Sequence, residues 1–470
     1  MGKTRTTGDR AQWGSNRGFI WAAAGSAVGL GTIWKFPGKA YAGGGGLYCL
    51  VYILVIILLG AVAMLGEFAV GRHTQRNCVA AFRSLRKGWG WVGLLGVLSS
   101  LIVLFYYVEV GGWVIRYIVG YVLEPDRIFS TPTTYFATLT GGDGCFPWAG
   151  AVWYPLLFTL ATALVMSGGV SGGIEKFNKL VMPLLLVVLA VLVFATLALP
   201  GAMDGVRFLT HVDWSGLNFD LVLSALGQCF FSLSLGMSVM VTYGSYLSRQ
   251  ENLVSNVWVI CLIDTAVAFL SGFIVVPAIF ATPGAEMGGG GSFTFTALTG
   301  VFASMPGGVY VGLLFYLLLL FAALTSSISL LEAIVSYLTE EWHVGRGKAI
   351  WCTSILIFFV GAVYTISYGG EQAAFPLYLL WFDRHGFYSV TIAEYIELLA
   401  DRLAIPLAAL AGCLFVGWVW GTNQAGAEIR QAGRFAFRLE RLWAWLIRYV
   451  APIAITTILV GGLWFGLSLS

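Results

Sequence analysis

The most unusual chemical feature of the sequence is an acid inside an apolar stretch. Asp264 is the only charged residue between Val254 and Ala281. A carboxylate at that depth in a membrane costs at least about 2.5 kcal/mol unless it is paired. The residue alone leaves two interpretations: a polar contact that joins neighbouring helices, or a charge that serves a functional site.

Two other segments combine helix-breaking residues with hydroxyls. Gly25, Gly29 and Gly31 lie close together, and each glycine weakens a helix by roughly 1 kcal/mol. The second segment, 230–236, contains two serines and a glycine, and its hydroxyls can bond backbone groups that a break sets free. Unwound backbone exposes carbonyl oxygens, which hard cations prefer. The alternative for Gly25 and Gly29 is close helix packing.

The composition indicates what kind of structure must position these residues. Of 470 residues, 58% are hydrophobic and 10% are charged, and the mean hydropathy is +0.84. Soluble domains carry about 25% charged residues, so the chain is expected to lie in a lipid bilayer. A net charge of +3 does not indicate nucleic acid. The seven cysteines lack metal or redox spacing. The sequence has no Walker, HExxH or GxSxG motif, so we do not expect an enzyme.

A membrane-spanning helix needs about 20 mostly apolar residues. The sequence contains eleven such segments, which we expect to form one domain over residues 1–470. The predicted spans are Gly18–Lys39, Leu47–Arg72, Trp91–Val122, Ala149–Met166, Phe177–Leu199, Leu217–Tyr246, Asn256–Ala281, Gly308–Tyr337, Ala349–Tyr368, Ala393–Gly421 and Leu442–Leu467. A cytoplasmic tail, 1–17, precedes a core of 18–246 and 247–421, and the eleventh span occupies 442–467.

The basic residues predict the orientation. Most of the 26 lysines and arginines fall in the N-terminal tail or in loops on the same side of the predicted bilayer. Because positively charged loops stay in the cytoplasm, the N-terminus is expected inside. An odd number of spans then places the C-terminus outside.

Motifs along nearly the whole chain resemble the neurotransmitter:sodium symporter family, in its bacterial eleven-span branch. They are Trp13, Gly25–Gly31, Trp34–Pro37, Gly44–Gly46, Glu67–Gly71, Tyr106–Tyr107, Gln228–Gly236, Thr242–Tyr243, Leu324–Ser327 and Arg448–Pro452. The resemblance implies an all-α polytopic membrane protein with a LeuT-type 5+5 inverted repeat, in which the first and sixth spans are unwound, and an additional eleventh span. It also implies amino-acid symport with Na+ by alternating access in the bacterial inner membrane.

The resemblance implies two sodium sites. In the second site, three carbonyls and two hydroxyls would bind the cation, from Gly25, Val28, Ala322, Thr325 and Ser326. In the first site, the ligands would come from Ala27, Thr32, Ser232 and Asp264. This first site departs from the family, because Thr32 and Asp264 both stand where asparagine is usual. The acid therefore adds a negative charge.

That charge bears on chloride. Chloride-dependent members hold the anion with a tyrosine, a glutamine and two hydroxyl residues. Tyr52, Gln228 and Ser232 match three of these positions, whereas Ala268 lacks the fourth hydroxyl. Asp264 would supply the missing negative charge, so the sequence predicts transport without chloride.

The resemblance also implies which residues bind the substrate. A carboxylate would meet the amides at the start of the outer half of the first span, with Tyr107 as a hydroxyl partner. Glycine at position 29, where amine transporters carry aspartate, favours a substrate with its own carboxylate. The expected contacts are Ser26, Ala27, Gly29, Leu30, Gly31, Val103, Tyr107, Phe231, Ser232, Ser234, Met237, Ser326 and Leu330. These residues carry no charge, which favours neutral apolar or aromatic L-amino acids.

Charged residues near the span ends match the family's gates. Arg10 and Glu340, with Trp13, are expected to close the inner side, and Lys35 and Glu397 the outer side. Two alternatives to sodium symport stay open: proton coupling, because Asp264 could titrate, and a solute sensor of the same fold. The expected partners are a small amino-acid substrate and the lipid bilayer.

Overall fold

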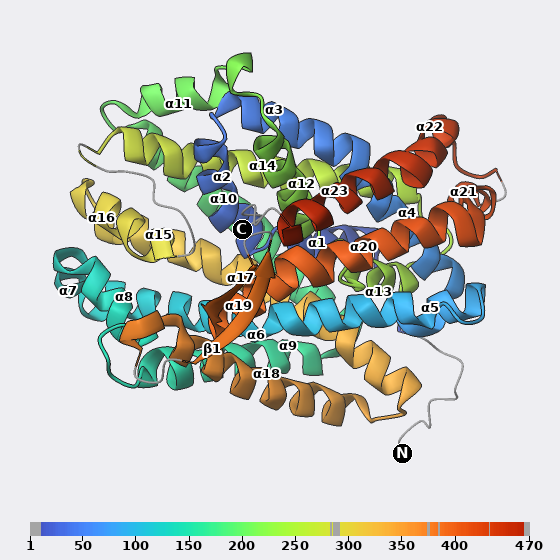
Figure 1. Cartoon of the computed structure of the whole chain (residues 1–470), viewed down its shortest axis with the longest axis horizontal. Helices are drawn as coiled ribbons and strands as arrows, with labels where there is room; N and C mark the ends of the chain where they lie inside the picture. The colour runs from blue at the N-terminus through green and yellow to red at the C-terminus, as the bar shows by residue number, and fades with distance from the viewer. Residues whose placement is uncertain are drawn as a thin grey trace.

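The structure is a computed structural model that describes residues 11–282, 284, 292–373, 377–383, 386–431 and 433–464. Its long helices run side by side along the longest axis of the molecule (Figure 1). Nine helices in this part of the chain are long and apolar enough to cross a membrane: Gly46–Thr74, Gly90–Leu123, Trp148–Ser167, Val170–Leu197, Leu253–Phe280, Gly308–Glu341, Arg346–Tyr368, Ile392–Arg430 and Glu440–Leu463. With the two interrupted segments described below, they correspond to the eleven predicted spans.

Several of these spans contain π-helical turns, so each is built from shorter elements. The uninterrupted helices are α6 (Gly90–Leu123), α14 (Leu253–Phe280), α17 (Gly308–Glu341) and α18 (Arg346–Tyr368). The composite spans contain α3 (Gly46–Val55) with α4 (Ala61–Thr74), α9 (Tyr154–Ser167), α10 (Lys176–Leu197), α19 (Ile392–Leu398) with α20 (Ile405–Leu414) and α21 (Thr422–Arg430), and α22 (Glu440–Trp445) with α23 (Ala451–Trp464). The π-helical turns are Ile56–Gly60, Trp148–Trp153, Val170–Glu175, Leu399–Ala404, Phe415–Gly421 and Leu446–Val450.

The first span is broken where the glycines predict it. Helix α1 (Asn16–Ala27) ends before Val28, whose ψ of 71° is not helical. A π-helical turn over Gly31–Lys35 then leads into α2 (Phe36–Ala42). The backbone around the break can therefore direct its carbonyls and amides into the protein interior.

The sixth span is broken in the same way. Helix α12 (Phe219–Ser232) and helix α13 (Val239–Ser245) are separated by a segment with positive φ at Ser234 (52°), Gly236 (72°) and Ser238 (57°). Positive φ is uncommon for serine and costs free energy, so the surrounding packing must hold this conformation. The prediction of two interrupted spans, five apart, is confirmed.

The broken spans lie within the bundle. Helix α1 packs against α10, α14 and α17, while α12 packs against α3 and α13 against α4. Both broken spans are thus enclosed by other spans of the bundle. Three uninterrupted helices bring side chains to the first span: Tyr107 on α6, Asp264 on α14 and Ser326 on α17.

The connections contain structure that hydropathy did not predict. They form α5 (Cys78–Leu85), α7 (Pro125–Ser130), α8 (Pro132–Thr140), α11 (Ala202–Thr210), α15 (Ser292–Phe295), α16 (Ala297–Ser304), 3₁₀ turns at Trp214–Gly216 and Gly370–Gln372, and an antiparallel hairpin of β1 (Tyr378–Asp383) and β2 (Gly386–Thr391). In the hairpin, Tyr378 pairs with Thr391. Figure 1 shows α7, α8 and α16 at one end of the bundle, and α5, α21 and α22 at the other.

Candidate functional site

A small cavity lies between the two breaks. All the predicted substrate contacts line it except Leu30: Ser26, Ala27, Gly29, Gly31, Val103, Tyr107, Phe231, Ser232, Ser234, Met237, Ser326 and Leu330. Leu30 takes part in the wall through its backbone, because its N–H donates to the Tyr107 hydroxyl at 2.8 Å. The residues that line the cavity include no charged side chain.

The space beside Gly29 shows why this position has no side chain. A Cβ atom there would lie 2.5 Å from the Ser326 hydroxyl oxygen and 2.6 Å from the Tyr107 hydroxyl oxygen. Both hydroxyls therefore approach the backbone of the first break directly. Even alanine at this position would displace them, and aspartate would extend into the cavity itself.

Serine hydroxyls connect the two breaks across the cavity wall. Ser234 donates to the backbone carbonyl of Ser26 at 3.0 Å, and the hydroxyls of Ser26 and Ser329 lie 2.6 Å apart. Ser329 was not predicted as a site residue. Its signal in the sequence was its place in the run of hydroxyl residues that begins at Thr325, one helical turn earlier.

The carboxylate of Asp264 joins the two broken spans. Its Oδ1 atom accepts from the Ser232 hydroxyl at 2.7 Å and from the Thr32 hydroxyl at 3.0 Å. Its Oδ2 atom accepts from the Tyr52 hydroxyl at 3.3 Å. All four side chains are at most 2% exposed. Asp264 therefore links neighbouring helices, as one interpretation of the sequence expected, and it lies in a buried cluster of oxygen atoms, as the other requires.

The number of hydrogens in this cluster tests whether a cation fits. The Thr32 hydroxyl oxygen lies 3.0 Å from the Ala27 carbonyl, 2.7 Å from the Ser232 hydroxyl and 3.0 Å from Asp264. Each hydroxyl has one proton to donate, so the oxygens have more close contacts than the available protons can bridge. A surplus of lone pairs around a buried carboxylate is a donor set that suits a hard cation such as sodium.

Three of the residues predicted for the second sodium site, Gly25, Thr325 and Ser326, are brought together from two spans. The Ser326 hydroxyl lies 3.3 Å from the Gly25 carbonyl, and the Thr325 hydroxyl donates to the Ala322 carbonyl at 3.0 Å. Val28 is the residue at which α1 ends. The side chains of Thr325 and Ser326 are buried, so their hydroxyls are neutral oxygens away from bulk solvent.

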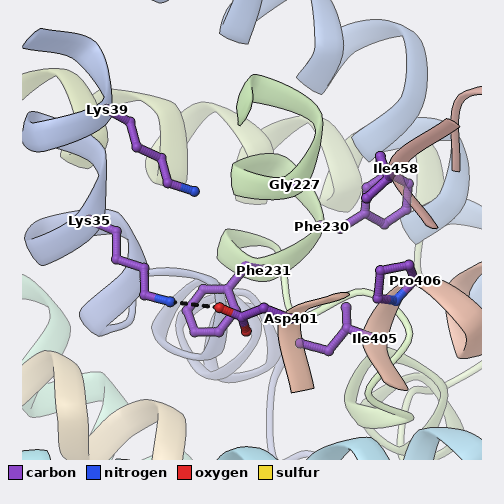
Figure 2. Close-up of a pocket in the computed structure, with 9 residues that line it drawn as sticks. All are labelled: Lys35, Lys39, Gly227, Phe230, Phe231, Asp401, Ile405, Pro406 and Ile458. Atoms are coloured by element: carbon purple, nitrogen blue, oxygen red, sulfur yellow. Dashed lines mark hydrogen bonds and ion pairs between the residues drawn. The ribbon is translucent and has the colours of Figure 1, made fainter. Parts of the chain in front are cut away.

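A second, small cavity is bordered on one side by Lys35 and Lys39 (Figure 2). Phe231 lines both cavities and therefore lies between them. The Lys35 ammonium is 2.9 Å from the Asp401 carboxylate and 4.4 Å from the centre of the Phe231 ring. This arrangement can close the first cavity from one side.

The ion pair corrects the predicted partner of Lys35. The sequence predicted Glu397, but that side chain accepts from the Tyr364 hydroxyl at 2.5 Å, and Asp401 pairs with Lys35 instead. The two acids are one helical turn apart. A π-helical turn over Leu399–Ala404 contains Asp401, and its wider winding rotates the later residues relative to a regular α-helix.

On the opposite side, Trp13 is anchored to the end of the sixth span. Its indole N–H donates to the Tyr243 carbonyl at 3.0 Å, and its ring meets the Tyr243 ring edge-on. Glu340 accepts from the backbone and side-chain N–H groups of Asn77 at 2.8 and 3.0 Å. Arg10, the predicted partner of Glu340, lies outside the described residues.

Sequence reasoning missed two ion pairs near this side. Arg72, whose side chain is fully buried, binds Glu428 at 2.8 Å. Arg346 binds the buried Glu332 at 2.6 Å, and Glu332 also accepts from Tyr246. The signal that could have revealed both pairs is an acid or a base within or at the end of an apolar span, since such groups are rarely left unpaired.

Comparison with known proteins agrees with this geometry. A match to the sodium:neurotransmitter symporter family covers residues 10–124 and 135–465. An uncharacterized sodium-dependent transporter, YhdH, of Bacillus subtilis is 35% identical over 94% of this chain and 96% of its own length. A sodium-dependent transporter of Haemophilus influenzae is 32% identical over 98% and 100% of the two chains.

A solved structure is similar over almost the whole length. The crystal structure of MhsT in complex with L-phenylalanine matches with a TM-score of 0.83 and 35% identity, and it covers 96% of this chain and 99% of that one. The sodium-dependent serotonin transporter of Drosophila melanogaster is a more distant relative, at 24% identity. This multi-pass membrane protein, broken at its first and sixth spans, belongs to the sodium:neurotransmitter symporter family.

Proposed function

We propose that this chain is a sodium-coupled symporter of neutral apolar or aromatic L-amino acids, working by alternating access and independently of chloride. The observation that carries the proposal is the uncharged cavity at the two breaks, with the Asp264 cluster directly behind its wall. Ser232 belongs to both, since it lines the cavity and donates to Asp264. Sodium is the coupling ion to which the family name and the names of the relatives point.

The backbone at the first break supports a substrate carboxylate. The N–H of Leu30 faces the Tyr107 hydroxyl at the start of a helical segment. Helix N-termini attract anions, so a carboxylate would accept from these two donors. With glycine at position 29, no side-chain carboxylate competes for them.

The rest of the cavity supports an apolar side chain. Val103, Phe231, Met237 and Leu330 form its apolar part. Methionine adapts to different shapes and packs well against aromatic rings. Uncompensated charge on the substrate side chain would be costly to bury here. The structural neighbour MhsT was crystallised with L-phenylalanine, a ligand of the proposed class.

Hydrogen bonding around Asp264 supports independence from chloride. The hydroxyls of Tyr52 and Ser232 donate to the carboxylate, and the Gln228 amide donates to the Gly31 carbonyl at 2.8 Å. These groups match three of the four chloride-binding positions. Because Tyr52 and Ser232 already donate to a fixed negative charge, an additional anion at these two groups would be repelled.

The cellular setting is part of the proposal. We place the chain in a bacterial inner membrane with the N-terminus in the cytoplasm and the C-terminus outside. The arginines of α5 and α21 lie at one end of the bundle (Figure 1), and positively charged segments favour the cytoplasmic side. The cavity in Figure 2 would then face outward.

Uptake by purified protein in proteoliposomes tests the function. Labelled neutral amino acids should accumulate against their gradient only when sodium is high outside, and replacing chloride with gluconate should not change the rate. Sodium-free accumulation that follows a proton gradient would favour the proton-coupled alternative, in which Asp264 titrates. Saturable binding without any accumulation would favour a solute sensor.

A further inference from the structure

We infer that the side-chain oxygen of Asn178 is an additional ligand at the second sodium site. The inference rests on the proposed sodium coupling and deepens it by one residue. Asn178 lies near the start of α10 and is fully buried. Neither composition nor the family motifs pointed to this residue.

The orientation of the Asn178 amide is fixed by a backbone group. Its Nδ2 atom donates to the Ile174 carbonyl at 2.9 Å. A carbonyl oxygen can only accept, so the amide cannot be flipped without placing two acceptors against each other. The Oδ1 atom must therefore point away from Ile174, toward the interior.

The Oδ1 atom points at Gly25, in the last turn of α1 before the first break. A Cβ atom built on Gly25 would lie 2.2 Å from Asn178 Oδ1 and 3.2 Å from Thr325 Cβ. Asn178 and Thr325 therefore contact the same face of Gly25. Gly25 and Thr325 are two of the five residues proposed to bind sodium, and they come from two different spans.

This oxygen has no hydrogen-bond partner among the described residues. A buried amide oxygen that accepts nothing is costly, and such atoms are rare in native proteins. The proposed ligands of the second site are all neutral oxygens, and a hard cation gains from each additional one. A sodium ion at this site satisfies the unpaired oxygen, and the oxygen in turn stabilises the ion.

Glycine at position 25 is what permits the approach. Any side chain there would occupy the place of Asn178 Oδ1. The glycine thus has a second role in this chain, besides weakening the helix: it lets the fifth span contribute to a site otherwise formed by the first and eighth.

Replacement of Asn178 with leucine tests the inference, because leucine has a similar size and no oxygen. Equilibrium binding of radioactive sodium and the sodium-dependent increase in Tm should both need about tenfold more sodium than the wild type, as expected for loss of one bond to a charged group. Asn178→Ala should show a smaller shift, because a water molecule can enter the space that it leaves.

A matched control lies on the same helix. Thr196 of α10 is also fully buried, and its hydroxyl also lacks a partner among the described residues. Thr196→Val should leave sodium affinity unchanged. Saturating sodium should restore wild-type substrate affinity in Asn178→Leu, which a folding defect would not allow.

The outcomes separate this inference from the proposed function. If the wild type binds sodium and Asn178→Leu binds it equally well, the inference is overturned and sodium coupling stands. Substrate binding by Asn178→Leu that high sodium fails to restore also overturns it. If the wild type shows no sodium binding by either measurement, both the inference about Asn178 and the proposed function fail.

Discussion

Ser232 donates a hydrogen bond to Asp264 over 2.7 Å, and this contact joins the end of α12 to the middle of α14. The same carboxylate oxygen accepts from Thr32, beyond the first break. One acid therefore holds both broken spans against a continuous helix. A change in the charge of Asp264 is expected to affect cation binding and the geometry of the cavity wall together.

The first prediction concerns that charge. Asp264→Asn keeps the shape of the side chain but removes the negative charge, so the half-saturating sodium concentration for uptake should rise by at least about tenfold. Adding Ala268→Ser restores the missing hydroxyl, and the double variant should recover uptake only when chloride is present. Ala268→Ser alone is the control. Strong chloride dependence of the wild type would contradict the role given to Asp264.

The second prediction concerns the other sodium site. Thr325→Ala combined with Ser326→Ala removes two hydroxyl ligands and should abolish sodium-driven uptake, while the protein stays folded and in the membrane. Ser336→Ala is a matched control, because this serine is buried on the same helix and donates to the Ala333 carbonyl at 3.1 Å. Uptake assays and size-exclusion profiles of the three proteins provide the comparison. Undiminished uptake by the double variant would exclude the assignment.

The third prediction concerns Gly29. Because a Cβ atom there would contact Tyr107 and Ser326 at 2.6 and 2.5 Å, Gly29→Ala should weaken substrate binding, and Gly29→Asp should abolish it. Gly38→Ala is the control, since a Cβ atom on Gly38 meets nothing within 4 Å. Scintillation-proximity binding measures the affinities. Wild-type affinity in Gly29→Asp would mean that the substrate carboxylate is bound elsewhere.

The fourth prediction separates two acids on the outer side. Asp401→Asn breaks the ion pair with Lys35, so bound substrate should dissociate several-fold faster, as expected for the loss of a partly buried charge pair. Glu397→Gln keeps a hydrogen-bonding side chain beside Tyr364 and should change dissociation less. Time courses of label release from sodium-loaded protein distinguish them. The reverse order would restore Glu397 as the partner of Lys35.

Sequence alone predicted the spans well, because lipid requires long apolar helices and the edges of these helices are marked by polar residues. The residues that line the cavity at the two breaks were nearly all named from the motifs, and the assignment of this cavity to the substrate stays a proposal. The partner of Lys35 was wrong for a local reason. Glu397 and Asp401 are equally plausible acids in a regular helix, and only the π-helical turn over Leu399–Ala404 decides between them.

Other features left no clear mark in the sequence. The hairpin β1–β2 and the short helices lie in connections, where hydropathy carries little information. The roles of Asn178 and Ser329 depend on contacts between distant spans, because each meets a residue in the last turn of α1. Such contacts depend on how the helices pack against one another. The packing becomes known only when the three-dimensional structure is known.

The ring of Phe231 has a consequence for how this transporter can evolve. It forms part of both cavities, receives Lys35 on its face, and would lie 2.4 Å from a Cβ atom on Gly31. One side chain thus contacts the substrate space and the ion pair that closes it. Under the proposed function, a substitution at this position that changes which amino acids are accepted is expected to change how fast they are released as well. Substitutions of Phe231 are therefore expected to change substrate selectivity and transport rate together.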